Sequence, residues 1–202
     1  MSHKCFISFK KEDLYYKNKL IEKFDVSDII DKTLDRVIDS NDGDYIMSVI
    51  RRDYLKDSTV TIFLIGEHSS ENEGSEYLGP KNYFIQKGLQ ATLYNGKDNS
   101  RSGLIGVVLP DMYSKIYKGS YLCSKCNNSH NYVNINDNTV IREFSQNYYI
   151  VPHSGCGWSQ EDRYAILVKW DDFYSNPEKY IEQAFEKRSD PIANKVRIYN
   201  LR

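Results

Sequence analysis

The sequence predicts an α/β domain built on an open, doubly wound and mainly parallel sheet. Four apolar runs have the composition of strands that are buried on both faces, since they are rich in β-branched residues and bounded by Gly, Pro or charged residues. They are residues 5–9, 60–66, 103–110 and 164–170. Segments with apolar residues at helical spacing separate them. Strands that alternate with helices along a chain favour a parallel sheet with helices on both faces.

Four helices are expected between and after these strands, over residues 13–24, 43–58, 80–94 and 176–188. The third starts with Pro80, a residue that the first turn of a helix tolerates. The last has Asn176 as a candidate N-cap, Pro177 in its first turn and Glu178 near its positive end. These signals place the helix ends.

Length and charge restrict the class of protein. A chain of 202 residues fits one domain, here with an insert over residues 111–160. Its 27 basic and 28 acidic residues give a net charge of -1, so we expect no nucleic acid and no anionic membrane as a partner. The N-terminus enters the first strand without a signal peptide, which predicts a cytoplasmic protein whose cysteines are thiols or metal ligands.

The insert is polar, lacks the periodic pattern of a helix or strand and holds three of the four cysteines. Cys123 and Cys126 are separated by two residues, a spacing that lets two thiolates bind one Zn²⁺. Cys156 and either His130 or His153 would complete four ligands, and His153-x-x-Cys156 repeats the spacing. The sequence therefore predicts a structural zinc site, with ordinary thiols or a redox pair as the alternatives.

In open α/β sheets ligands bind outside the carboxyl ends of the strands. The first three apolar runs end here at Phe9, Gly66 and Pro110. The loops after these residues lack a Gly-rich nucleotide fingerprint. The loop after the second apolar run contains His68 and several carboxylates. One of these carboxylates acts as a base or binds a ribose, or else the charges only keep an exposed loop in solvent. The carboxylates are Glu67, Glu71, Glu73 and Glu76.

Gly88 lies in the middle of the third expected helix, where a glycine costs about 1 kcal/mol relative to alanine. Two explanations remain open at this point. A neighbouring backbone passes close to Gly88, or a side chain that belongs at this position is missing.

Several strings together resemble the TIR-like family, which includes the nucleotide-signalling TIR subunit of Thoeris anti-phage defence systems. They are KCFISFKKED, STVTIFLIGEHSSEN, GLIGVVLP and YAILVKWDDFYSNPEKYIEQAFEKR. The resemblance implies a flavodoxin-like fold and NAD as substrate, cleaved at the nicotinamide–ribose bond to give an ADP-ribose-derived signal. That signal would activate a separate effector protein, with a phage component as the trigger. Whether the chain forms a homo-oligomer stays open.

The resemblance also implies a catalytic glutamate in the helix after the third strand, four residues after an aromatic residue. Phe84 matches the aromatic position, and Gly88 stands where the glutamate is expected. Either the carboxylate has been lost, by nature or by engineering, or another residue such as Glu71 supplies it. A catalytically silent nucleotide- or protein-binding module is the alternative function. We expect Gly88 to face the substrate cleft beside Phe9.

Substrate contacts are implied at the end of the first strand and in the segment that follows. The implied residues are Ser8, Phe9, Lys10, Asp31 and Asp39, together with Phe84 of the third expected helix. Phe9 would stack on a ring of the nucleotide, or else belong to the core. Lys10 would bind a phosphate, or else be a solvated surface charge.

Overall fold

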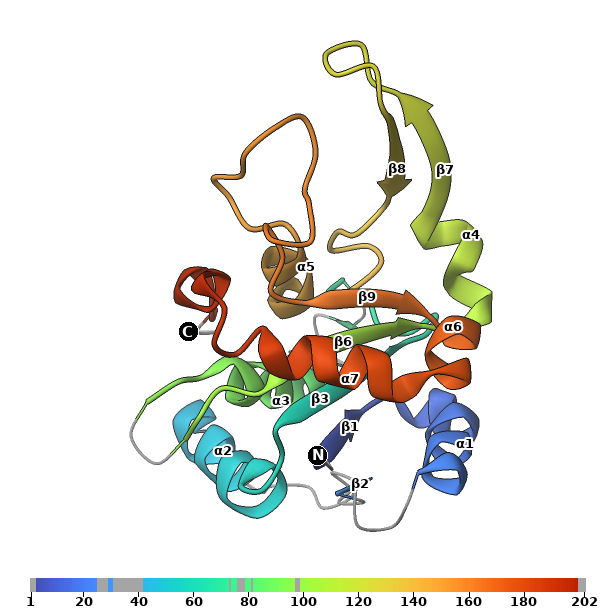
Figure 1. Cartoon of the computed structure of the whole chain (residues 1–202). Coiled ribbons are helices and arrows are strands. Elements are labelled where there is room, and N and C mark those ends of the chain that lie inside the picture. The colour runs from blue at the N-terminus through green and yellow to red at the C-terminus, as the bar shows by residue number, and fades with distance from the viewer. Residues whose placement is uncertain are drawn as a thin grey trace.

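The computed structural model describes residues 3–24, 29–30, 42–72, 74–75, 79–80, 82–96 and 99–199. A five-stranded sheet of order β2-β1-β3-β6-β9 lies in the middle, and all its neighbouring strands are parallel (Figure 1). The strands are β1 (Cys5–Ser8), β2 (Ile29–Ile30), β3 (Val60–Ile65), β6 (Gly103–Val108) and β9 (Ile166–Lys169). All four predicted apolar runs lie in this sheet, so the predicted doubly wound α/β fold is confirmed.

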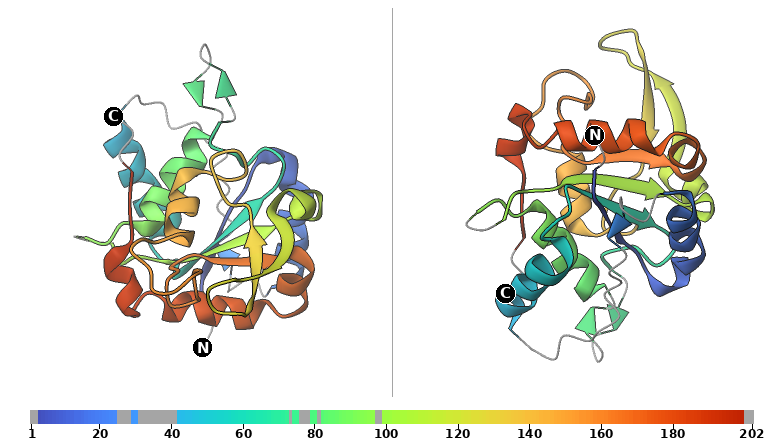
Figure 2. Two further views of the ribbon diagram at one scale, coloured as in Figure 1. Left: turned by 90° about the horizontal axis from the view of Figure 1, so that it is seen from above. Right: turned by 60° about the horizontal axis from the view of Figure 1, so that its bottom comes forward.

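Helices cover both faces of the sheet (Figures 1 and 2). One face packs against α1 (Leu14–Lys23), α6 (Trp170–Ser175) and α7 (Pro177–Glu186), and the other against α2 (Gly43–Val49), α3 (Tyr83–Leu93) and α5 (Arg142–Tyr148). Every residue of β3 is buried because its side chains alternate between these two layers. Burial on both faces explains why the strand is continuously apolar.

One helix start and one helix type differ from the prediction. Pro80 does not begin a helix but lies in β5 (Gly79–Pro80), which pairs with β4 (Gly74–Ser75), and α3 begins after Asn82. The Asn82 amide donates to the carbonyl oxygens of His68 and Ser70, at 3.2 and 2.5 Å, and so holds the preceding loop against the helix. α2 continues into wider π-helical turns over Ile50–Leu55.

The last long helix follows the predicted signals. Pro177 is its first residue, and the Asn176 side chain accepts a hydrogen bond from the backbone N–H of Lys179 at 3.4 Å. Within the described ranges, no helix is both long and apolar enough to cross a membrane.

The insert is more regular than the sequence indicates. A short helix, α4 (Tyr113–Ile116), leads into an antiparallel hairpin of β7 (Tyr117–Leu122) and β8 (Ser129–Val133), which projects from the body (Figure 1). The chain then returns to the sheet, where Phe144 of α5 is fully buried. Part of the insert therefore belongs to the main core, while the hairpin and the loop 151–163 extend beyond it.

Candidate functional site

The carboxyl ends of β1 and β3 form a topological switch point. β1 is followed by α1 on one face of the sheet, and β3 by α3 on the other, so the two connections leave in opposite directions. Ligands bind at such points in open α/β sheets. Asp13 and Gly66 meet here. A Cβ atom on Gly66 would lie 2.2 Å from Oδ1 of Asp13, so the carboxylate occupies space that only a glycine leaves free.

Asp13 is an unusual carboxylate for its position. The residue is 6% exposed, and its Oδ2 atom has no hydrogen-bond partner among the residues that the structure describes. Burial, followed by the charges of Asp111 and Glu12, raises the pKa of Asp13 from 3.8 to about 7, against the opposing effect of His68 and Lys10. A carboxyl group with a pKa near neutrality is suited to giving and taking protons.

Sequence reasoning did not find Asp13, because it lies between Glu12 and Leu14 at what looks like an ordinary helix start. The available signal was its position shortly after the first strand. Its burial depends on the close approach of Gly66, which is a tertiary contact between segments far apart in the sequence.

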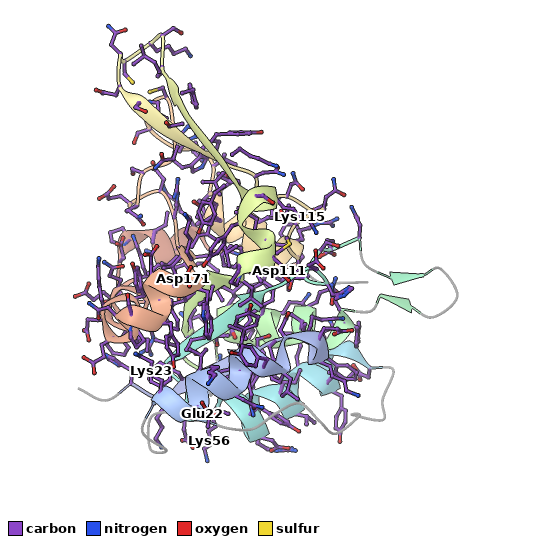
Figure 3. All side chains as sticks on the ribbon, turned by 90° about the vertical axis from the view of Figure 1, so that its right-hand side faces the viewer. Glu22, Lys23, Lys56, Asp111, Lys115 and Asp171 are labelled. Carbon is purple, nitrogen blue, oxygen red and sulfur yellow. The ribbon has the colours of Figure 1, made fainter. Side chains whose placement is uncertain are left out.

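A second layer of charge lies beside this carboxylate. Asp111 follows β6 and has a pKa raised by burial and by the charge of Glu67. Glu67 forms an exposed ion pair with Lys115, at 2.9 Å from Oε1 to Nζ, and this hydrogen bond lowers the pKa of Glu67. Asp111 lies at the base of α4 and Lys115 further along the same segment (Figure 3). The edge thus carries both signs of charge.

The predicted substrate residues after β1 occupy different environments. Ser8 is buried at the end of the strand. Phe9 packs against the apolar cluster on the α1 side, and Lys17 Nζ lies 6.0 Å from the centroid of its ring. Lys10 is half-buried, and its carbonyl oxygen accepts the backbone N–H of Asp13 at 2.8 Å. Asp31 and Asp39 are outside the described residues.

Gly88 lies on the opposite side of the sheet from Phe9. Phe84 and Ala91, on the same face of α3, pack in the cluster formed with α2 and with Phe6 of β1. The expected place of Gly88 beside Phe9 is therefore corrected, because Phe9 points to the α1 layer. Gly88 is buried, yet a Cβ atom there would meet no described heavy atom within 4 Å. Close approach of a described neighbour does not explain this glycine.

Glu71 has a structural role in the loop before α3. Its Oε1 atom accepts from Nε2 of Gln86 at 2.9 Å, and its Oε2 atom accepts the backbone N–H of Arg142 at 2.8 Å. The side chain thus joins α3 to the first turn of α5, and both of its oxygens are engaged. Glu73 and Glu76 lie outside the described residues.

The cysteine cluster forms away from the switch point, on the projecting hairpin. Cys123, Cys126, His130 and Cys156 place their ligand atoms within 4.8 Å of one another. His130, not His153, joins the thiols. The His153 ring stacks instead on Trp158, with 3.9 Å between ring centroids, so of the two histidines that the sequence left open the assignment to His153 is corrected to His130. All three thiols of the cluster are free.

The sheet order and its switch point define a flavodoxin-like α/β domain. A family model described as the TIR-like domain of the Thoeris protein ThsB matches residues 6–75. The matched residues, which include Asp13 and Gly66, are thus similar to a TIR-like domain of a Thoeris protein, in agreement with the resemblance found in the sequence. No solved structure gives a significant match to the chain.

Proposed function

We propose that this chain is a cytoplasmic TIR-like protein of an anti-phage system that binds NAD or a related nucleotide at the carboxyl edge of its sheet. With glycine at position 88, it cleaves the nicotinamide–ribose bond slowly or not at all. The observation that carries the proposal is Gly88. It occupies the position of the glutamate that the family resemblance implies, on a continuous helix and with no described atom near the missing Cβ.

A carboxylate at this position matters for the chemistry. Departure of nicotinamide leaves oxocarbenium character on the ribose, and a preorganised negative group stabilises that charge in the transition state. Glycine supplies no such group. Glu71, the described loop carboxylate nearest in sequence to α3, supports no replacement role because both of its oxygens are already engaged.

The experiment compares nicotinamide release from NAD by the protein as written and by three variants at one position. Gly88→Glu is expected to raise the rate by about 10²-fold or more, the usual effect of one preorganised electrostatic group. Gly88→Gln keeps the size of the side chain without its charge, and Gly88→Ala keeps only the gain in helix propensity. Neither control is expected to raise the rate. Equal rates for the Glu and Gln variants would count against a role for charge.

Nucleotide binding is tested separately from cleavage. A ligand that binds only the folded state raises its stability by RT ln(1 + [L]/Kd), so NAD is expected to raise the melting temperature of the protein as written. Lys10→Ala is expected to reduce this shift if Lys10 binds a phosphate. An unchanged melting temperature at saturating NAD, supported by calorimetry without binding heat, would favour the protein-binding alternative.

A second candidate function is NAD cleavage by the unmodified chain, with Asp13 as the active carboxylate. The specific observation in its favour is a buried carboxyl group at the switch point, with a pKa of about 7 and an Oδ2 atom that has no hydrogen-bond partner in the described part of the chain. Asp13→Asn distinguishes the two functions. It abolishes nicotinamide release if Asp13 is catalytic, and it leaves a background rate unchanged if the chain only binds.

A further inference from the structure

We propose that Cys123, Cys126, His130 and Cys156 bind one structural Zn²⁺, which fastens the β7–β8 hairpin to the loop 151–163. The Nε2 atom of His130 lies 3.1 Å from the sulfur of Cys126 and 3.1 Å from the sulfur of Cys156, and these two sulfurs are 3.3 Å apart. Ligand atoms around a tetrahedral zinc are about 3.5–3.8 Å apart, given bonds of about 2.0–2.3 Å. The three separations are a few tenths of an ångström shorter than these, and all four ligand atoms lie within 4.8 Å of one another, so the four groups converge on one point and need move apart only slightly to hold the ion.

The first two ligands come from a tight turn at the tip of the hairpin. The backbone N–H of Asn127 donates to the carbonyl oxygen of Cys123 at 2.9 Å, and the N–H of Cys123 donates to that of Asn128 at 2.9 Å. Asn127 has a φ of 56°, a left-handed conformation that asparagine tolerates better than most residues. This turn brings the sulfurs of Cys123 and Cys126 to the same side.

The other two ligands come from different segments. His130 lies on β8, opposite Tyr121 of β7. Cys156 belongs to the loop after α5 and follows Gly155, whose φ of 88° suits a glycine and turns the chain. Ligands from the hairpin turn, a strand and a distant loop thus converge on one point. Three sulfurs and one imidazole nitrogen form a typical donor set for structural zinc.

The hairpin lacks the burial that would hold it in place without a metal. Most residues of β7 and β8 are exposed, and Leu122 is 73% exposed. A two-stranded hairpin alone is marginally stable in water. A bound zinc ion supplies folding free energy to such a segment. A disulfide between Cys126 and Cys156 would use only two of the four converging groups.

The proposed zinc site also shapes the surface between the β7–β8 hairpin and the loop 151–163. The hairpin and the loop enclose a hollow of about 1140 Å³. Its lining includes Tyr121, Tyr132, Tyr149, Trp158 and Arg163. The Tyr149 hydroxyl donates to the carbonyl oxygen of Val133 at 2.6 Å within this lining, and His130 and Cys156 of the proposed zinc site also line the hollow.

The test is metal analysis of the full-length protein purified with a reductant, together with a matched pair of histidine variants. We expect about one zinc per chain as purified, retained in His153→Ala and reduced at least tenfold in His130→Ala after dialysis against a weak chelator. Cobalt substitution adds an optical readout. The protein and His153→Ala are expected to show the visible bands of tetrahedral cobalt and thiolate charge-transfer bands, which His130→Ala weakens or shifts.

Folding of each variant is checked by circular dichroism, and Cys126→Ser gives a second ligand variant if His130→Ala fails to fold. Several results would overturn the proposal. They are protein without zinc that does not take up zinc or cobalt, one equivalent of iron instead of zinc, a Cys126–Cys156 disulfide in peptide mapping, or the same metal loss in both histidine variants.

Discussion

At the scale of single residues, burial changes the proton affinity of the Asp13 carboxyl group strongly. Burial favours its neutral form, so its pKa of about 7 in the folded protein lies above its ordinary value of 3.8. Below pH 3.8 the carboxyl group is protonated in both the folded and the unfolded protein, so it does not make the free energy of unfolding depend on pH. As the pH rises from 3.8 to 7, the carboxyl group ionises in the unfolded protein but stays protonated in the folded protein, so the free energy of unfolding falls across this range.

Asp13→Asn removes that charge at every pH. At pH 8 we expect the free energy of unfolding of the variant to exceed that of the unmodified protein by ~2–4 kcal/mol, since one pKa unit corresponds to about 1.4 kcal/mol. The difference should vanish near pH 4. Urea unfolding at the two pH values measures it. Glu143, whose pKa burial also raises to about 7, is present in both proteins and cancels in the comparison. A difference independent of pH would contradict the assignment.

Gly88 and Gly103 form a matched pair for alanine substitution. Gly88→Ala is expected to stabilise the protein by up to ~1 kcal/mol, because alanine is the better helix former and no described atom opposes a Cβ. Gly103→Ala is expected to destabilise it by ~1–3 kcal/mol, because its Cβ would lie 2.1 Å from the backbone oxygen of Ala184 on α7. Thermal unfolding compares the two. Destabilisation by Gly88→Ala would show that an atom outside the described residues fills this space.

At the scale of elements, Glu71 couples the loop before α3 to the start of α5. Glu71→Ala leaves the amide of Gln86 and the backbone N–H of Arg142 without their acceptor, which should cost ~1–3 kcal/mol of unfolding free energy. Glu71→Gln keeps one acceptor oxygen and should cost less. Chemical denaturation ranks the variants. NAD cleavage that depends on Glu71 in properly folded protein would instead make it the active carboxylate.

The sequence predicted the elements whose signals are local. The continuous apolar run of β3 indicates burial on both faces, and the N-cap at Asn176 fixes the start of α7. Pro80 misled the prediction because proline suits both a first helical turn and a short edge strand. Asp13, and the choice between His130 and His153, depend on which distant segments meet, and spacing along the chain does not contain that information.

At the scale of the whole molecule, two parts have different sources of stability. The parallel sheet is buried between two helical layers, whereas the hairpin is mostly exposed and converges on the proposed zinc site. Zinc removal by a strong chelator is expected to speed amide hydrogen exchange in β7, β8 and the loop 151–163 by about tenfold or more, while β3 and β6 stay protected. An equal acceleration of amide hydrogen exchange in the sheet would mean that the zinc site stabilises the entire fold.

The central proposal is that this chain keeps the fold of a nucleotide site but lacks the carboxylate for NAD cleavage. The most direct test is the initial rate of nicotinamide release, measured for the unmodified protein and Gly88→Glu under identical conditions. The account predicts a background rate for the unmodified protein and a rate about 10²-fold higher for the variant. Rapid cleavage by the unmodified protein, with no gain from Gly88→Glu, would contradict it.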